Sequence, residues 1–419
     1  MSKVCIITQF YPPDYAATGQ LIEELAKQLS RQEIEITILT GQPAYGWGKS
    51  LAPSREKNDK IQVIRSFTSR IWPQCLRGRA INGLLFCFRS GLRLLRPKYR
   101  GEVLLLTTEP PYLLILGYFA KLLLRVPYVC LLYDLYPDVA VSLNVVTEKH
   151  WLTRFWNWIN CKIWRNAQGL IVLSSTMKER IVAKCPDVAD KISVIHSWSD
   201  PNYIIPKPKT ENPFAIKHHL VKPFTVMYSG NMGRCHDMET IMQAAWELRN
   251  NDIQFVFIGG GAKYNQCYET LTKKWGLNNC LFLPFQDKKE LPNSLTACDL
   301  SLVTISEEME GLVAPSKLYG ILAAGKPVAA ICKHSSYLRQ LLEKADCGQS
   351  FVNGDSTGLA NYICFLASHR KKAEVMGENG RCYLKTHFTP EIIAQEYIKV
   401  LFGSKPLKYS SSPSMEQFT

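Results

Sequence analysis

The residues best suited to chemistry lie in the stretch 304–328, which reads TISEEMEGLVAPSKLYGILAAGKPV. It starts at the end of an apolar run and passes through an acidic loop that contains Glu310. Pro315 and Ser316 then form a helix-entry signal, with Lys317 in the first turn. Backbone N–H groups and a lysine at a helix start favour a phosphate, and carboxylates accept hydrogen bonds from sugar hydroxyls. The stretch therefore indicates a sugar-phosphate site; the alternative is an ordinary strand–helix connection with a solvated acidic loop.

A pair of carboxylates follows a predicted strand in the first half of the chain. The apolar run 128–132 ends in Tyr-Asp-Leu-Tyr-Pro-Asp, which places Asp134 and Asp138 just beyond it. Ligands of open α/β sheets bind beyond the carboxyl ends of the strands, so both residues are candidates for a catalytic role. Loop hydrogen bonding, which is common for Asp, is the alternative interpretation.

Small residues mark further loops where a ligand can approach the backbone. They are 16–19 (AATG), 229–234 (SGNMGR) and 259–261 (GGG), each directly after a predicted strand or its loop. The dinucleotide fingerprint G-x-G-x-x-G does not occur. Neither D-x-D nor C-x-x-C occurs, so we expect no metal site and no cofactor.

The elements that position these residues repeat one architecture twice. Short apolar strands alternate with helical segments in 1–200 and again in 224–388. This pattern predicts an α/β protein with two Rossmann-like doubly wound domains that face a central cleft. Prolines crowd 201–223, which we expect to be a linker. A final helix, 389–403, is expected to pack back on the first domain, and the Ser-rich tail 404–419 is expected to be disordered.

The formal net charge of +14 requires an explanation in terms of partners. Segment 65–100 holds nine Lys or Arg and no Asp or Glu, interleaved with Trp, Phe and Leu; segment 149–165 holds four Trp among basic residues. This composition is typical of a surface that lies on an anionic membrane. Nucleic acid is a weaker interpretation because no nucleic-acid motif accompanies the charge. A core helix with a solvated basic face also remains open. No apolar run reaches the length of a membrane span, and no signal peptide is expected.

The chain resembles the retaining glycosyltransferases of family GT4, which have the GT-B fold. The matching phrases are 10–14 (FYPPD), 228–233 (YSGNMG), 283–285 (LPF) with 290–292 (ELP), 314–319 (APSKLY) and 323–328 (AAGKPV). The resemblance covers nearly the whole chain and is strongest to members that build bacterial polysaccharides. It implies metal-independent transfer of a sugar from a nucleotide sugar to an acceptor hydroxyl, with the donor bound by the C-terminal domain and the acceptor by the N-terminal domain.

Carried over position by position, the resemblance implies two sets of site residues. The catalytic candidates are Asp134, Asp138 and Glu310. The donor-binding candidates are Ala17, Gly19, Gly230, Asn231, Arg234, Gly260, Pro284, Phe285, Glu310, Leu312, Val313, Ser316, Lys317 and Leu318.

Several positions depart from the family pattern. The Glu-x7-Glu motif falls on Leu312 and Gly320, and Asn231 takes the place of the usual Arg. Of the two aspartates, Asp134 is expected to matter more, by orienting the acceptor or stabilising positive charge at the reacting sugar carbon.

The expected donor is UDP-glucose or a UDP-N-acetylhexosamine, and the expected acceptor is a glycan or a lipid-linked sugar. The protein is expected to be a monomer or weak dimer in the cytoplasm, peripheral on the inner membrane face. Two other functions stay open at this point: a sugar-nucleotide epimerase of the same fold, and a non-catalytic basic module that binds membrane or nucleic acid.

Overall fold

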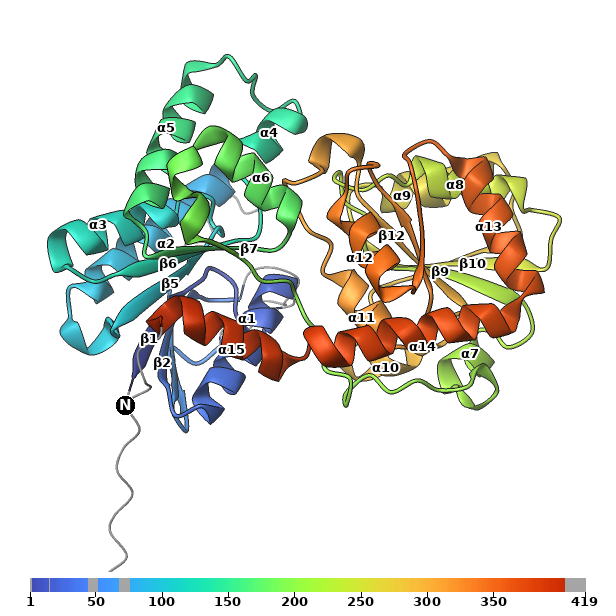
Figure 1. Ribbon diagram of the computed structural model, residues 1–419, viewed down its shortest axis with the longest axis horizontal. Helices are drawn as coiled ribbons and strands as arrows, with labels where there is room; N and C mark the ends of the chain where they lie inside the picture. The colour runs from blue at the N-terminus through green and yellow to red at the C-terminus, as the bar shows by residue number, and fades with distance from the viewer. Residues whose placement is uncertain (1, 15, 44–51, 68–75, 404–419) are drawn as a thin grey trace, which may run out of the picture.

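The computed structural model describes residues 2–14, 16–43, 52–67 and 76–403. Within these ranges the chain forms two α/β units, each built on one sheet with helices on both faces (Figure 1). The predicted fold class is therefore confirmed. The tail 404–419, expected to be disordered, lies outside the described residues.

The first unit contains an eight-stranded sheet of order β3-β4-β2-β1-β5-β6-β7-β8, in which β3 alone runs antiparallel to its neighbour. Its strands are β1 (Lys3–Ile7), β2 (Glu35–Gly41), β3 (Arg55–Asn58), β4 (Ile61–Ser66), β5 (Val103–Thr107), β6 (Tyr128–Leu132), β7 (Gly169–Val172) and β8 (Ile192–Val194). Its α-helices are α1 (Ala17–Arg31), α2 (Leu76–Leu94), α3 (Leu114–Leu124), α4 (Asp138–Ser142), α5 (Trp151–Asn166) and α6 (Ser175–Lys184). Strands β5 and β6 are buried at every residue because they lie mid-sheet under helices, which explains their unbroken apolar sequences.

The second unit contains a six-stranded parallel sheet of order β11-β10-β9-β12-β13-β14. Its strands are β9 (Phe224–Asn231), β10 (Ile253–Gly260), β11 (Cys280–Leu283), β12 (Leu300–Thr304), β13 (Val328–Ile331) and β14 (Gly348–Phe351). The helices that follow β8 are α7 (Pro213–Lys217), α8 (Glu239–Glu247), α9 (Tyr264–Tyr268), α10 (Leu291–Thr296), α11 (Lys317–Ala323), α12 (Tyr337–Ala345), α13 (Ser356–Ser368), α14 (Arg370–His387) and α15 (Pro390–Phe402). A short 3-10 helix, η6 (Glu307–Met309), precedes α11.

The chain crosses twice between the units. It leaves β8 through residues 195–204, and it returns after α14, so that α15 packs against α1 of the first unit (Figure 1). The Gln28 amide donates to Glu391 of α15 at 3.1 Å. At the crossings, His196 accepts or donates a hydrogen bond with the Tyr319 hydroxyl at 3.1 Å, and its ring lies 5.2 Å from that of Phe388. Aromatic side chains therefore pack together where the chain crosses between the two units.

Three parts of the sequence interpretation differ from the structure. Strands β3 (REKN) and β14 (GQSF) were not predicted, because both are edge strands with polar sequences. Segment 201–223 is more than a linker: it contains η3 (Lys209–Glu211) and α7, and Phe214 of α7 is buried against α10. Ser316 precedes α11 as predicted, but its side chain makes no capping hydrogen bond.

The glycine-rich ends of β9 and β10 pack without room for side chains, which gives the first prediction. Gly259 has φ +135°, and a Cβ there would lie 2.1 Å from the Gly230 carbonyl oxygen. We expect Gly259→Ala to lower the free energy of unfolding by about 3 kcal/mol or more, in urea denaturation. Gly276 also has positive φ (+62°) but open space around it, so Gly276→Ala should cost only about 1 kcal/mol. Equal costs would show that the close packing of β9 and β10 does not matter.

Candidate functional site

A buried, unpaired cation lies at the start of α11. The Lys317 side chain runs over Gly230, where a Cβ would lie 3.4 Å from the lysine Cε. Its Nζ lies 3.6 Å from the centre of the Tyr228 ring, a cation–π contact. Nζ is buried and finds no hydrogen-bond partner among the residues that the structure describes. Burial lowers the pKa of Lys317 to about 7. Such a group is stabilised in its charged form when an anion binds beside it.

Bare backbone lies next to this cation. Strands β9 and β10 end in register, with Gly259 opposite Gly230 and Gly260 opposite Asn231. The absence of side chains there allows a ligand to reach the main chain. Phe285, in the loop after β11, lies against Gly260: a Cβ at Gly260 would lie 3.0 Å from the ring. The Phe285 ring is nevertheless 63% exposed and so offers a flat face to a planar ligand.

A buried carboxylate lies in the loop between β12 and α11. Glu310 is only 5% exposed, and its Oε1 accepts a hydrogen bond from the Thr176 hydroxyl at 2.9 Å. Its Oε2 is buried and unpartnered within the described part of the chain. Since a buried acceptor without a donor is costly, this oxygen is suited to a ligand hydroxyl.

The first unit contributes two carboxylates with raised pKa values. Burial raises the pKa of Asp134, just beyond β6, to about 6. Burial also raises the pKa of Glu109, just beyond β5, to about 7, and the charges of Asp134 and Asp14 add to that effect. Glu109 Oε2 accepts a hydrogen bond from Thr18 at 2.6 Å. Sequence reasoning missed Glu109, although it follows its strand just as Asp134 follows β6.

Asp134 lies close to the second unit. Burial raises the pKa of the Cys235 thiol, in the loop after β9, and the negative charge of Asp134 raises it further. His236, the next residue, is held by the carbonyl of Thr304 at 2.8 Å, and burial lowers its pKa to about 3, with the Lys317 charge adding. The structure therefore brings Asp134 and the Lys317 region to the same junction between the units.

Other predicted residues have structural partners of their own. Asp138 begins α4 and forms an ion pair with Lys184 at 2.5 Å. The Asn231 amide fills the space beside Gly261, where a Cβ would meet its Oδ1 at 2.2 Å. Arg234 is exposed. The Asp138 carboxylate and the Asn231 amide thus both contact residues of their own units.

The remaining candidates shape the backbone around the site. Gly19 lies in the first turn of α1, which Ala17 begins, and a Cβ there would lie 3.1 Å from the carbonyl of Phe10. Leu312 and Leu318 are buried, Val313 and Ser316 are half-buried, and Pro284 is exposed. Gly320, at the family's second Glu position, faces Leu295 of α10, whose Cδ1 would lie 3.3 Å from a Cβ.

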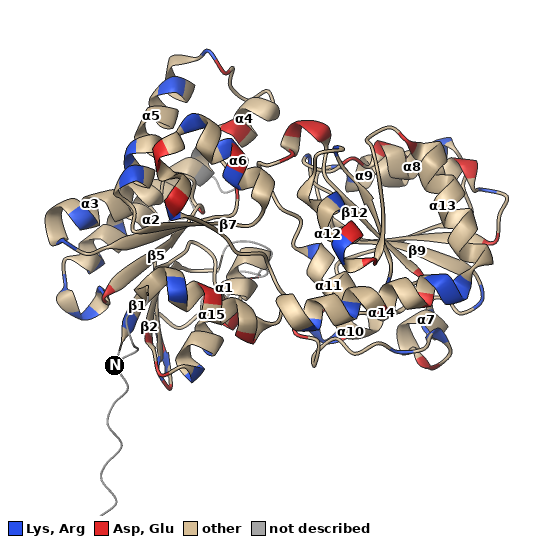
Figure 2. Cartoon of the chain, viewed as in Figure 1, with Lys and Arg blue, Asp and Glu red and all other residues tan. Residues whose placement is uncertain are grey.

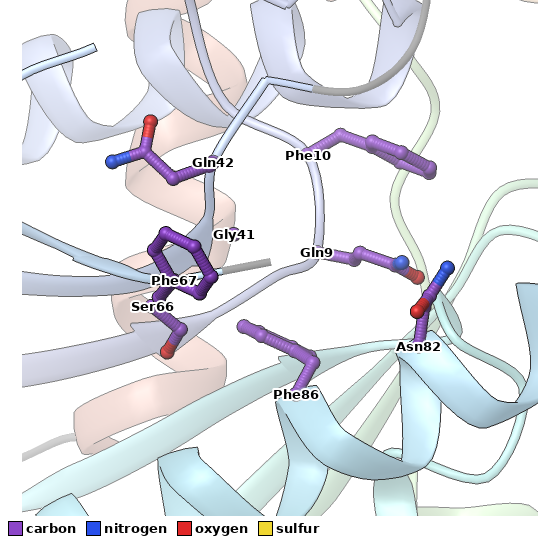
Figure 3. Close-up of a pocket in the computed structure, with 8 residues that line it drawn as sticks. All are labelled: Gln9, Phe10, Gly41, Gln42, Ser66, Phe67, Asn82 and Phe86. Carbon is purple, nitrogen blue, oxygen red and sulfur yellow. The ribbon is translucent and has the colours of Figure 1, made fainter. Parts of the chain in front are cut away.

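A separate small hollow lies in the first unit, beyond β1, β2 and β4. It is lined by Gln9, Phe10, Gly41, Gln42, Ser66, Phe67, Asn82 and Phe86, with the Gln9 and Asn82 side chains close together (Figure 3). Among the described residues there is no group of three His, Cys, Asp or Glu that could hold a metal ion.

The buried lysine makes stability depend on pH in a defined direction. Its folded pKa of about 7 lies below the usual 10.5, so the unfolded chain binds more protons between these values. The free energy of unfolding should therefore rise with pH above 7, by up to about 1.4 kcal/mol per unit from this group. Urea denaturation from pH 6 to 9.5 should show that Lys317→Met is more stable than the native chain at pH 6 and loses this slope. Lys273→Met, at an exposed lysine, should keep it; parallel profiles for Lys317→Met and the native chain would contradict the burial of a charge.

Two family models match this chain, one in each half. Residues 17–198 match the family model "Glycosyl transferase 4-like domain", and residues 210–382 match "Glycosyl transferases group 1". A Pseudomonas aeruginosa protein named "Probable glycosyltransferase WbjE" is 24% identical over 87% of this chain and 89% of its own length. WcaI of Escherichia coli, named for glycosyl transfer in colanic acid biosynthesis, is 34% identical over 28% of this chain and 29% of its own length.

Two solved structures share the fold. Sucrose-phosphate synthase from Thermosynechococcus elongatus superposes with a TM-score of 0.75 at 16% identity, over 96% of this chain and 98% of that one. Anabaena HepE in complex with UDP-glucose superposes with a TM-score of 0.71 at 16% identity, over 96% and 99%. The two family matches together span both α/β units, and the chain belongs to the group 1, GT4 family of glycosyltransferases with the GT-B fold, enzymes of EC class 2.4.

Proposed function

We propose that this enzyme transfers a hexose from UDP-glucose or a UDP-N-acetylhexosamine to a glycan or lipid-linked acceptor in bacterial polysaccharide synthesis, with retention of configuration and without a metal. The observation that carries the proposal is the buried Lys317 ammonium, unpaired within the described residues and beside the bare backbone of Gly230. A diphosphate supplies the missing negative charge. The UDP-glucose complex of HepE, which has the same fold, supports this choice of donor.

The order of strands arranges the proposed donor contacts in a line. The sheet runs β11-β10-β9-β12. Gly260 and Gly230 lie at the carboxyl ends of β10 and β9, and Phe285 and Glu310 follow β11 and β12. Along this edge, the exposed ring of Phe285 comes first and the backbone of Gly260 second. The backbone of Gly230 beneath the Lys317 ammonium follows, and the Glu310 carboxylate comes last. A nucleotide sugar has the matching sequence of planar base, ribose, diphosphate and hydroxyl-rich ring. We place the donor along this edge, with Glu310 Oε2 accepting from a sugar hydroxyl.

The acceptor then approaches from the first unit. A second hydroxyl of the acceptor, not the one that reacts, donates to Asp134, which thereby orients the acceptor. The Asp134 carboxylate also stabilises positive charge at the sugar carbon. The bond from that carbon to the leaving phosphate oxygen breaks, the bond to the acceptor oxygen forms on the same face, and the phosphate takes the acceptor proton. Because the leaving group acts as the base, Asp134 need not accept the proton. Asp138 has no part in this scheme, since its carboxylate is paired with Lys184.

The acceptor is proposed to lie at an anionic membrane. Helix α3 of the first unit contacts both α2 and α5. The three helices form a basic apolar face, on which Leu122, Leu123 and Trp151 are 64%, 71% and 67% exposed. Its other exposed apolar residues are Ile81, Leu84, Phe88, Leu92, Phe119, Leu152, Phe155 and Trp158. Lys121 is the one basic residue of α3, whereas α5 carries Arg154, Lys162 and Arg165 (Figure 2), and no Asp or Glu occurs in the three helices.

Part of the basic, aromatic sequence has a structural role instead. Trp164 is buried, and Trp156 stacks on Tyr136 with ring centres 6.4 Å apart. No described helix is long and apolar enough to cross a membrane. The proposed contact is therefore peripheral: apolar side chains enter the interface and Lys or Arg pair with anionic headgroups.

The donor proposal is tested by calorimetry with UDP, GDP, ADP and their sugars in the presence of EDTA. We expect UDP-glucose or UDP-N-acetylglucosamine to bind. Lys317→Met should weaken UDP binding about thirtyfold or more, because a buried charge pair loses one partner. Lys273→Met should bind normally, and Asp134→Asn should keep its donor affinity while losing transfer. Failure of every UDP compound, or binding that EDTA abolishes, would overturn the proposal. A product formed from UDP-sugar without any acceptor would indicate an epimerase.

The membrane proposal is tested by co-sedimentation with vesicles of phosphatidylglycerol and phosphatidylcholine. Binding should weaken as salt rises, since headgroup attraction is screened. Replacing Leu122, Leu123 and Trp151 by Ser should weaken it about tenfold or more, because apolar area leaves the interface. The matched control replaces Ile216, Val352 and Val375 by Ser, which are exposed apolar residues of the second unit. Equal loss in both triple variants, or no vesicle binding at low salt, would contradict this surface.

A further inference from the structure

We infer that the donor-sugar carboxylate, Glu310, is positioned by the opposite unit, with Thr176 of α6 as the positioning residue. The inference rests on the proposed function, since it takes Glu310 to contact the donor sugar. Thr176 is 6% exposed and Glu310 5% exposed, and the hydroxyl donates to Oε1 at 2.9 Å. The two residues are 134 positions apart and belong to different units, Thr176 to helix α6 and Glu310 to the loop between β12 and α11. One oxygen of the carboxylate is therefore fixed by the first unit and the other is left for a ligand.

The whole loop around Glu310 docks on the first unit. The backbone N–H of Leu135 donates to the carbonyl of Leu312 at 3.0 Å. The Arg180 guanidinium donates to the carbonyl of Glu310 itself at 3.0 Å. Ser142, at the end of α4, donates to the carbonyl of Glu308 at 3.1 Å. In Figure 1 this loop extends from the second unit toward α4 and α6. The hydrogen bonds hold the backbone, so that Thr176 acts on a side chain whose main chain is already fixed.

Gly311 makes this close approach sterically feasible. Its φ is +75°, and a Cβ there would lie 2.8 Å from the Thr176 carbonyl oxygen and 2.9 Å from Cγ of Arg180. Any side chain would push the loop away from α6 and lengthen the bond from Thr176 to Glu310. Because Gly311 has no side chain, the loop beside Glu310 can contact α6 of the first unit.

Recognition of the nucleotide and recognition of the sugar therefore depend on different parts of the protein. Lys317, Gly230 and Phe285 belong to the second unit alone and contact each other or their own sheet. They bind the nucleotide whether or not the units touch. Glu310 is held in place only when α6 lies against its loop. Recognition of the sugar therefore requires the first unit, which carries the acceptor, whereas recognition of the nucleotide does not.

The test compares the affinities of UDP, UDP-glucose and UDP-N-acetylglucosamine by calorimetry. In the native chain we expect the better UDP-sugar to bind more tightly than UDP. Thr176→Val keeps the shape but removes the hydroxyl; it should reduce this sugar-dependent gain about tenfold and leave UDP affinity within about twofold. Thr176→Ser restores a hydroxyl and should restore the gain. Gly311→Ala should also lose the sugar-dependent gain in affinity, because its methyl group would push the Glu310 loop away from α6.

The control is Thr153→Val, the same change at a buried threonine whose hydroxyl bonds only within its own unit, to the carbonyl of Thr147 at 2.9 Å. It should keep both affinities. The inference is overturned if Thr176→Val keeps the sugar-dependent gain, if it weakens UDP and UDP-sugars equally, or if the native chain binds UDP but gains nothing from either sugar. Failure of the native chain to bind UDP at all would instead overturn the proposed function.

Discussion

A positive charge buried without a counter-charge among the described residues is the constraint on which the rest of the structure depends. Lys317 is the first residue of α11. The connection from β12 to α11 places its side chain over Gly230, with the ammonium group buried. The face of Tyr228 stabilises the ammonium only in part. Gly230, near the end of β9, fits this arrangement, because a Cβ there would lie 3.4 Å from the lysine Cε. The second unit is thus less stable than it would be with an apolar residue at 317, and the diphosphate proposed to bind there would offset that cost.

The charged groups of the candidate site come from both units. The second sheet presents a cation and Glu310, and the first presents Glu109 and Asp134, whose pKa values burial raises toward neutrality. Carboxyl groups in that range hold a proton part of the time near pH 7. The junction between the units therefore contains groups whose charge responds to whatever lies between them, and neither sheet alone assembles the full set.

Much of this arrangement could be predicted from the sequence. Unbroken apolar runs such as 128–132 predict buried mid-sheet strands, and the Pro-Ser-Lys signal predicts where α11 begins, because both depend on local chemistry. Edge strands β3 and β14 could not be predicted, since polar residues are tolerated where one side of a strand meets solvent. The ion pair of Asp138 with Lys184 could not be predicted, because the two residues are 46 positions apart in the sequence. The bond from Thr176 to Glu310 depends on how two units pack, which no local pattern encodes.

The double crossing between the units has a mechanical consequence. Residues 195–204 and the turn between α14 and α15 lie together, as the contact between His196 and Phe388 shows, and α15 is anchored on α1. Two chain segments fixed side by side resist torsion about the line that joins the units, whereas a single tether would permit it. Any relative motion of the units would therefore be mainly a bend about one axis. A bend about that axis would move the loop of Glu310 toward or away from helix α6 without sliding one past the other.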